Sequence, residues 1–121
     1  MTQVRNYKDL IVWQKSMQVV VAIYALTKNL PHSEIYGLNS QMRRSAVSLP
    51  SNIAEGSRRG SRKEYRHFLR IAFGSGAELE TQLILAQQLF GLVDGKLNDL
   101  LDEVMKMLNR MISTLDSRQL T

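Results

Sequence analysis

The sequence contains no cysteine, only two prolines and only two histidines among its 121 residues. Without cysteine the chain has no disulfides, no thiolate metal site and no cysteine nucleophile. Two prolines and seven glycines are few for the many turns of an all-β fold. No stretch approaches the ~20 apolar residues that a membrane span requires. The first residues also lack the apolar segment of a signal peptide, so we expect a cytoplasmic protein that does not contact a membrane.

What the sequence does contain is typical of one folded domain. Hydrophobic residues make up 44% of the chain, which is ordinary for a globular protein and argues against disorder. A length of 121 residues is close to the common size of a single hydrophobic core. We therefore expect one domain over residues 1–121.

The first helix is expected over residues 7–30, because Pro31 cannot continue it. Two lines of apolar residues recur along this segment with the period of a helix. The first line is Leu10, Trp13, Met17, Val20 and Tyr24, and the second is Val12, Val19, Ile23, Leu26 and Leu30. Two lines favour burial on two sides. Either the second line faces another subunit, or one wide apolar face packs against two neighbouring helices of the same bundle.

The second helix is expected to begin near Leu38 or Asn39 and to end within residues 56–59. Pro50 lies inside its apolar line, removes one backbone hydrogen bond and predicts a kink; the alternative is two short helices that meet at this proline. Three polar side chains lie on the same helix: Gln41, Asn52 and Glu55. We interpret them as structural, completing backbone hydrogen bonds or contacts with another subunit, rather than as a ligand site.

The third helix is expected to start at the capping box formed by Ser61 and Glu64 and to end near Phe90. Gly74 and Gly76 lie in its interior, where glycine costs about 1 kcal/mol, and this favours the close approach of another helix. The predicted inward line is Tyr65, Phe68, Leu69, Ala72, Gly76, Leu79, Leu83, Ala86 and Leu89.

Gly91 separates this helix from a fourth, which begins at Asp94 or Gly95. The inward line of the fourth helix is Leu97, Leu101, Val104, Leu108, Met111 and Leu115. Four helices of about 20–28 residues joined by short loops predict an all-α, antiparallel, up-down-up-down four-helix bundle, with its second helix kinked at a proline.

The positive charge is concentrated in one quarter of the chain. The formal net charge is +5, yet residues 43–70 alone hold eight bases and two acids, a net +6. Guanidinium groups bind phosphate oxygens without reading a base sequence, so this segment is a candidate nucleic-acid-binding surface. The alternative is a solvated basic face that pairs with nearby carboxylates. The eight bases are Arg43, Arg44, Arg58, Arg59, Arg62, Lys63, Arg66 and Arg70.

Tyr65 is an aromatic residue among these arginines. Its helical phase directs it towards the core, which argues against a dedicated stacking site for single-stranded nucleic acid.

The sequence offers no catalytic set. Glu64 and His67 form an E-x-x-H pattern that occurs in di-iron bundles, but the further ligands of such a site are missing. The other histidine, His32, follows Pro31 in a loop. No nucleophile, base and acid recur together near either histidine. We therefore expect no enzyme activity, no metal and no cofactor.

Several short motifs occur in an order that resembles a known family. They include YKDL (7–10), VWQ (12–14), YGL (36–38), QMRR (41–44), NIAEG (52–56) and ELE (78–80). Over nearly its whole length the chain resembles the 23S ribosomal RNA intervening-sequence proteins, a four helix bundle family named for genes inside bacterial 23S rRNA genes. This resemblance implies a ring-like homopentamer. The chain is also similar to the accessory proteins of diversity-generating retroelements, which implies a reverse transcriptase and nucleic acid as partners.

Charge, periodicity and resemblance together predict a non-enzymatic homo-oligomer. It is expected to bind RNA, DNA or a ribonucleoprotein through electrostatic contacts from residues 43–70. The alternative is a protein-interaction scaffold, such as a reverse-transcriptase accessory protein, whose basic face meets an acidic partner.

Overall fold

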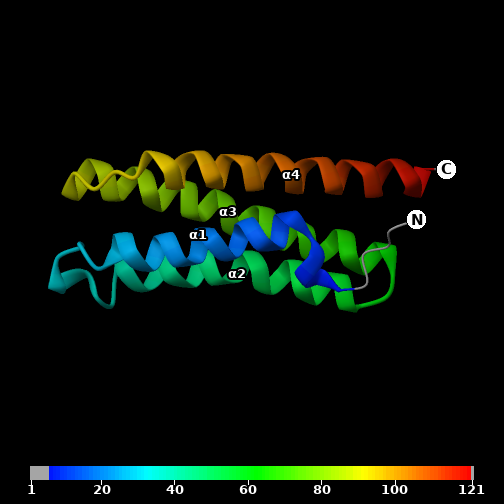
Figure 1. Ribbon diagram of the computed structural model, residues 1–121, viewed down its shortest axis with the longest axis horizontal. Coiled ribbons are helices and arrows are strands. Elements are labelled where there is room, and N and C mark those ends of the chain that lie inside the picture. The colour runs from blue at the N-terminus through cyan, green and yellow to red at the C-terminus, as the bar shows by residue number, and fades with distance from the viewer. Residues whose placement is uncertain (1–5, 121) are drawn as a thin grey trace.

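The described part of the chain, residues 6–120 of a computed structural model, folds into a bundle of four long helices, with side chains described to residue 117. The helices are α1 (Ile11–Thr27), α2 (Leu38–Arg58), α3 (Arg62–Phe90) and α4 (Gly95–Leu120), with short 3-10 turns η1 (Tyr7–Asp9) and η2 (His32–Glu34). Each long helix packs against the next in the chain, and α1 also packs against α4. Figure 1 shows the four helices lying along one long axis. The predicted all-α four-helix bundle is confirmed.

Two predicted breaks, between α2 and α3 and between α3 and α4, are confirmed by their capping contacts. Ser61 Oγ accepts a hydrogen bond from the backbone N–H of Glu64 at 3.1 Å, which satisfies one of the free donors at the start of α3. Gly91 ends α3 in the left-handed conformation with a φ of 68°, where glycine is favoured. Asp94 Oδ1 accepts from the N–H of Leu97 at 3.1 Å and so caps α4.

Helix α1 is shorter than the predicted segment 7–30. Leu10 has an extended backbone, so the chain makes η1 first and α1 begins only at Ile11. Asn6 Oδ1 accepts from the N–H of Lys8 at 2.9 Å and stabilises η1 as a separate turn. At the other end α1 stops at Thr27, before Pro31 is reached.

The two apolar lines of α1 contradict one of the two alternatives given for them, in which the second line faces another subunit. The second line, Val12 to Leu30, is buried in the core of the bundle, so it does not face another subunit. The first line is partly exposed: Met17 is 41% and Tyr24 39% accessible. Trp13 is half-buried, and its ring meets Tyr7 edge-on with 5.4 Å between ring centroids.

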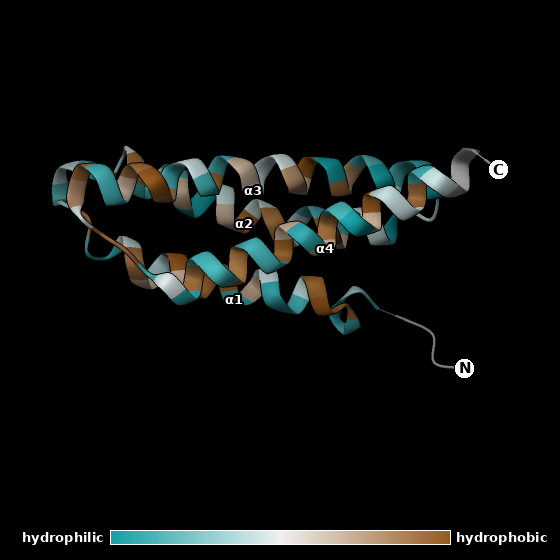
Figure 2. Cartoon of the chain, turned by 90° about the horizontal axis from the view of Figure 1, so that it is seen from above, coloured by the Kyte–Doolittle hydropathy of each residue, from teal (hydrophilic) through white to brown (hydrophobic). Residues whose placement is uncertain are grey.

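In Figure 2 hydrophobic residues recur along every helix, between hydrophilic ones.

Helix α2 runs without interruption through Pro50, so the alternative of two short helices is wrong. Leu49 and Pro50 are both buried, which fixes this part of α2 in the core. Ser48 Oγ lies 2.7 Å from Ser75 Oγ of α3. The side-chain N–H of Asn52 donates to both the carbonyl and the hydroxyl of Ser48, at 2.9 and 2.8 Å. The same helix also carries Gln41, whose side chain is exposed.

Of the two glycines predicted at a close helix crossing, Gly76 lies at such a crossing and Gly74 does not. A Cβ added at Gly76 would clash with the Met105 sulfur of α4, whereas a Cβ at Gly74 would meet nothing within 4 Å. A third glycine, Gly56, allows a close approach of α2 to α3, because a Cβ there would stand 2.8 Å from Phe68 Cβ. Leu89, predicted to face inward, is 64% exposed near the end of α3.

None of the helices in the described range 6–120 combines the length and the apolar character that a membrane-spanning helix needs.

Candidate nucleic-acid interface

Six of the eight predicted cations gather where α2 turns into α3. Two come from the last turn of α2 and its cap, and four from the first turns of α3. We call this group the turn cluster: Arg58, Arg59, Arg62, Lys63, Arg66 and Arg70. In Figure 1 this turn lies at the same end of the bundle as the end of α4 and the start of α1.

Arg43 and Arg44 lie apart from the turn cluster. Arg43 precedes Arg58 by 15 residues on a continuous helix, which places it roughly 22 Å away along the axis. Its Nε donates to Thr27 Oγ1 at 2.9 Å, and its guanidinium carbon lies 4.3 Å from the centre of the Tyr24 ring. Arg43 therefore ties α2 to the end of α1, and the eight cations do not form one continuous surface.

Three carboxylates lie within the turn cluster and neutralise part of its charge. Arg59 Nε is 3.2 Å from Glu55 Oε2 and 3.8 Å from Glu64 Oε2. Asp116 of α4 receives two arginines, Arg66 at 3.2 Å and Arg70 at 2.9 Å. Six cations against these three carboxylates leave a net +3.

The remaining three cations of the turn cluster are available to an external anion. Arg58, Arg62 and Lys63 are exposed, and none forms an ion pair with a residue in the described range 6–117. The guanidinium of Arg58 lies 5.4 Å from the centre of the Tyr7 ring, which positions it beside η1. Arg62 and Lys63 occupy the first turn of α3, where the helix dipole adds positive potential.

Two residues of α4 belong to this region, although helical periodicity alone did not indicate them. One is Asp116, the carboxylate shared by Arg66 and Arg70. The other is Arg110, which is exposed and lines a surface hollow together with Tyr65. Only the pairing of α3 with α4 in space brings Asp116 to the turn cluster and Arg110 to Tyr65, so a pattern within one helix carries no signal for them.

Changing Asp116 to asparagine should strengthen the binding of polyanions to the turn cluster. The change removes one negative charge from beside the guanidinium groups of Arg66 and Arg70, so we expect affinity to rise about 3- to 10-fold at low salt. The free energy of unfolding should change by less than about 1 kcal/mol, because partly exposed ion pairs contribute little. A binding titration and thermal unfolding of the same variant measure the two effects. Weaker binding by a folded variant would contradict this assignment of Asp116.

Tyr65 does not point wholly into the core as its helical phase predicted. Its side chain is half-buried and lines two hollows on the surface between α3 and α4. Burial raises the pKa of Tyr65 above its ordinary value of 10.0, because the charged phenolate loses solvation. The ring is therefore neutral at physiological pH.

Glu64 and His67, the E-x-x-H pair, are both exposed. They line a hollow of about 430 Å³ that also includes Lys63, Arg66 and Arg70. Three cations around this hollow disfavour a metal ion, whose charge they would repel. Within the described residues, no three histidine, aspartate or glutamate side chains are grouped so that they could hold a metal.

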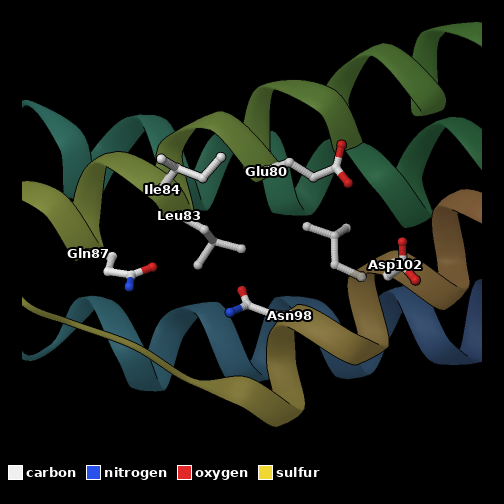
Figure 3. Close-up of a pocket in the computed structure, with 7 residues that line it drawn as sticks. Glu80, Leu83, Ile84, Gln87, Asn98 and Asp102 are labelled. Carbon is white, nitrogen blue, oxygen red and sulfur yellow. The ribbon is translucent and has the colours of Figure 1, made fainter.

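A hollow of the opposite charge lies towards the other end of the α3–α4 pair. It has a volume of about 240 Å³, and its lining includes Glu80 and Asp102, with Leu83 and Leu101 between polar neighbours. Figure 3 shows the two carboxylates on different helices, with Glu80 on α3 and Asp102 on α4. We call it the acidic hollow. It disfavours phosphate, so the turn cluster is the better candidate for a polyanion.

Comparison with known proteins places the chain in a family. The sequence profile of the 23S rRNA-intervening sequence proteins matches residues 8–113. A crystal structure of a protein of unknown function from the S23 ribosomal protein family of Bacteroides thetaiotaomicron is similar, with a TM-score of 0.74 and 26% sequence identity. The similarity covers 84% of this chain and 98% of that one. No curated protein is significantly similar in sequence. Because the profile covers most of its length, the chain belongs to the 23S rRNA-intervening sequence protein family.

Proposed function

We propose that this chain is a cytoplasmic, non-enzymatic bacterial protein that binds RNA through the turn cluster. The observation that carries the proposal is the net +3 charge at the α2–α3 turn, with Arg58, Arg62 and Lys63 free of carboxylates in the described part of the chain. Exposed guanidinium and ammonium groups at one end of a rigid bundle suit the oxygens of a phosphate backbone. Such contacts fix position without reading sequence, so RNA, DNA and ribonucleoproteins share the same chemistry.

The proposal includes assembly into a homo-oligomer, a pentamer by the family resemblance. Large apolar side chains at the surface support self-association: Val21 on α1 is 69% exposed, Ile84 on α3 is 55% exposed, and Val93 follows α3 with 58% exposed. Burying such side chains against another subunit would remove apolar surface from water, which is favourable. A ring of subunits would repeat the turn cluster, and simultaneous contacts would raise the overall affinity.

The experiment is a binding titration with a fragment of 23S rRNA, the RNA in the family's name, at salt concentrations from about 50 to 200 mM. If the turn cluster binds phosphates, the logarithm of the association constant should fall linearly with the logarithm of the salt concentration, with a slope of about −0.7 to −0.9 per phosphate bound. A DNA fragment of the same length should bind with a similar slope. Absence of binding, or binding that salt does not weaken, would contradict the proposal.

The second candidate is a protein scaffold whose basic face meets an acidic partner, such as a reverse transcriptase. The observation in its favour is that three arginines of the turn cluster already pair with carboxylates, as they would across an interface. Affinity purification with and without nuclease separates the two candidates. Nucleic acid recovered only without nuclease supports the first, and one acidic protein retained after nuclease supports the second.

A further inference from the structure

Two adjoining hollows open on the surface where the start of α3 meets the end of α4. One, of about 260 Å³, is lined by Tyr65, Met111 and Leu115 with Arg110 at its edge. The other, of about 370 Å³, lies beside the α2–α3 turn and is lined by Arg62, Gly56, Tyr65 and Leu115, among others. Tyr65 and Leu115 line both, so the two hollows adjoin at these side chains. We call the two hollows together the Tyr65 groove.

The Tyr65 ring is held in place by the backbone behind it. A Cβ at Gly56 would stand 3.1 Å from Tyr65 Cδ1 and 3.2 Å from the Tyr65 carbonyl oxygen. Gly56 of α2 thus packs directly against one side of this residue, which limits the positions that the ring can take. The rest of the half-buried side chain lines the groove, where it offers an aromatic surface that does not need to be ordered on binding.

The charged side chains that line the groove are all positive. Arg62 lines one hollow and Arg110 lines the other, and no aspartate or glutamate lines either hollow. Both arginines are exposed, and neither forms an ion pair with a residue of the described range. An apolar aromatic floor between two guanidinium groups matches a ligand that has a flat ring and an anion on each side of it.

A nucleotide within a single strand has this chemistry, because its base is a flat ring between two phosphates. We propose that the Tyr65 groove takes an unpaired base of single-stranded RNA, with the flanking phosphates held by Arg62 and Arg110. This inference rests on the proposed function and adds a preference to it. Bases inside a duplex are stacked on both faces and cannot enter the groove, so single strands and loops should bind more tightly than duplexes of equal charge.

The test uses the full chain and a short RNA with 2-aminopurine, a fluorescent base whose emission falls when it stacks on an aromatic ring. Binding of the single strand should lower this emission, and binding of the matching duplex should not. Tyr65→Leu should weaken single-strand binding by about 5- to 150-fold, the range for removal of one stacked base, and leave duplex binding unchanged. Tyr65→Phe retains the ring and should behave as the unchanged protein.

A second variant keeps the test decisive if Tyr65→Leu does not fold. Arg110→Gln alters an exposed side chain outside the turn cluster, so it should fold normally and weaken single-strand binding about 10-fold.

The inference is wrong if emission does not change on binding, or if both variants bind single strands as the unchanged protein does. In those cases the salt-dependent binding of duplex and single strand remains, and the proposed function stands. If neither RNA binds the unchanged protein, but an acidic peptide with an aromatic residue does, both the proposed function and the inference are wrong.

Discussion

Replacing Arg62 and Lys63 together with glutamate should reduce the affinity for RNA on the order of 100-fold at low salt. The two changes remove two phosphate-binding groups, and a loss of about 1.4 kcal/mol for each is a tenfold change. The slope of log affinity against log salt should become shallower by about two, one for each phosphate that the variant no longer binds. Binding titrations at several salt concentrations measure both quantities.

The position of these residues separates weaker binding from failure to fold. Arg62 and Lys63 lie in the first turn of α3 and form no ion pair with a residue in the described part of the chain. Glutamate is favoured in the first turn of a helix, because its negative charge interacts well with the helix dipole. We therefore expect the variant to be as stable as the unchanged protein, which thermal unfolding checks.

A matched control changes the same amount of charge at the opposite end of the bundle. Lys28 follows α1 and Lys96 lies in the first turn of α4, and both are exposed. Changing both to glutamate alters the net charge as much as the first variant does, so the two variants differ only in where the charge is removed. The control should lose less than about tenfold in affinity. Equal reductions in the two variants would show that net charge alone, and not the turn cluster, drives binding.

Replacing Leu49 with alanine should reduce the free energy of unfolding by about 2–5 kcal/mol. Leu49 is fully buried in α2, and its Cδ2 would lie 3.5 Å from a Cβ at Gly76. The Met105 sulfur of α4 packs against the same glycine, so Leu49 lies where three helices meet. Side chains held by three rigid helices have little freedom to fill the cavity that alanine would leave.

Val47→Ala is the control for this variant. Val47 lies two residues earlier on the same helix and is 41% exposed, so its truncation should change the free energy of unfolding by no more than about 0.5 kcal/mol. Urea unfolding followed by circular dichroism, at one fixed protein concentration, measures both variants. A loss below about 1 kcal/mol for Leu49→Ala would contradict the packing described for this crossing.

The sequence was sufficient to predict the bundle, because helix boundaries depend on local chemistry. Ser61 and Asp94 accept hydrogen bonds from free N–H groups in the first turn of a helix, and Gly91 ends one, all through contacts within a few residues. The prediction failed where a choice depended on neighbours far away in the chain. Helix α1 is apolar around much of its surface, so its periodicity alone could not say whether Val12 or Met17 faces the core.

The candidate site was predicted only in part, because some of its residues are close in sequence and others come from a different helix. The cations of the turn cluster are close in sequence, so their gathering follows from the α2–α3 turn. Arg43 was grouped with them because it is near in sequence, yet a continuous α2 carries it away. Asp116 and Arg110 were missed because they come from α4, about 45 residues or more later in the chain than the α3 residues beside them, which are Arg66 and Arg70 for Asp116 and Tyr65 for Arg110. Tyr65 packs against the core, as its helical phase predicted, but it is only half-buried, because helical phase gives the direction of a side chain and not the depth of its burial.

The acidic hollow has a consequence for how the protein would approach a polyanion. Glu80 lies in the second half of α3 and Asp102 in the first half of α4, nearer the end where Lys28 and Lys96 partly offset their charge, and the turn cluster with its net +3 lies at the other end. Such a separation of charge is an electric dipole along the axis of the bundle. In the field of a nucleic acid the dipole would rotate the molecule before contact, so that it arrives end-on with the α2–α3 turn leading.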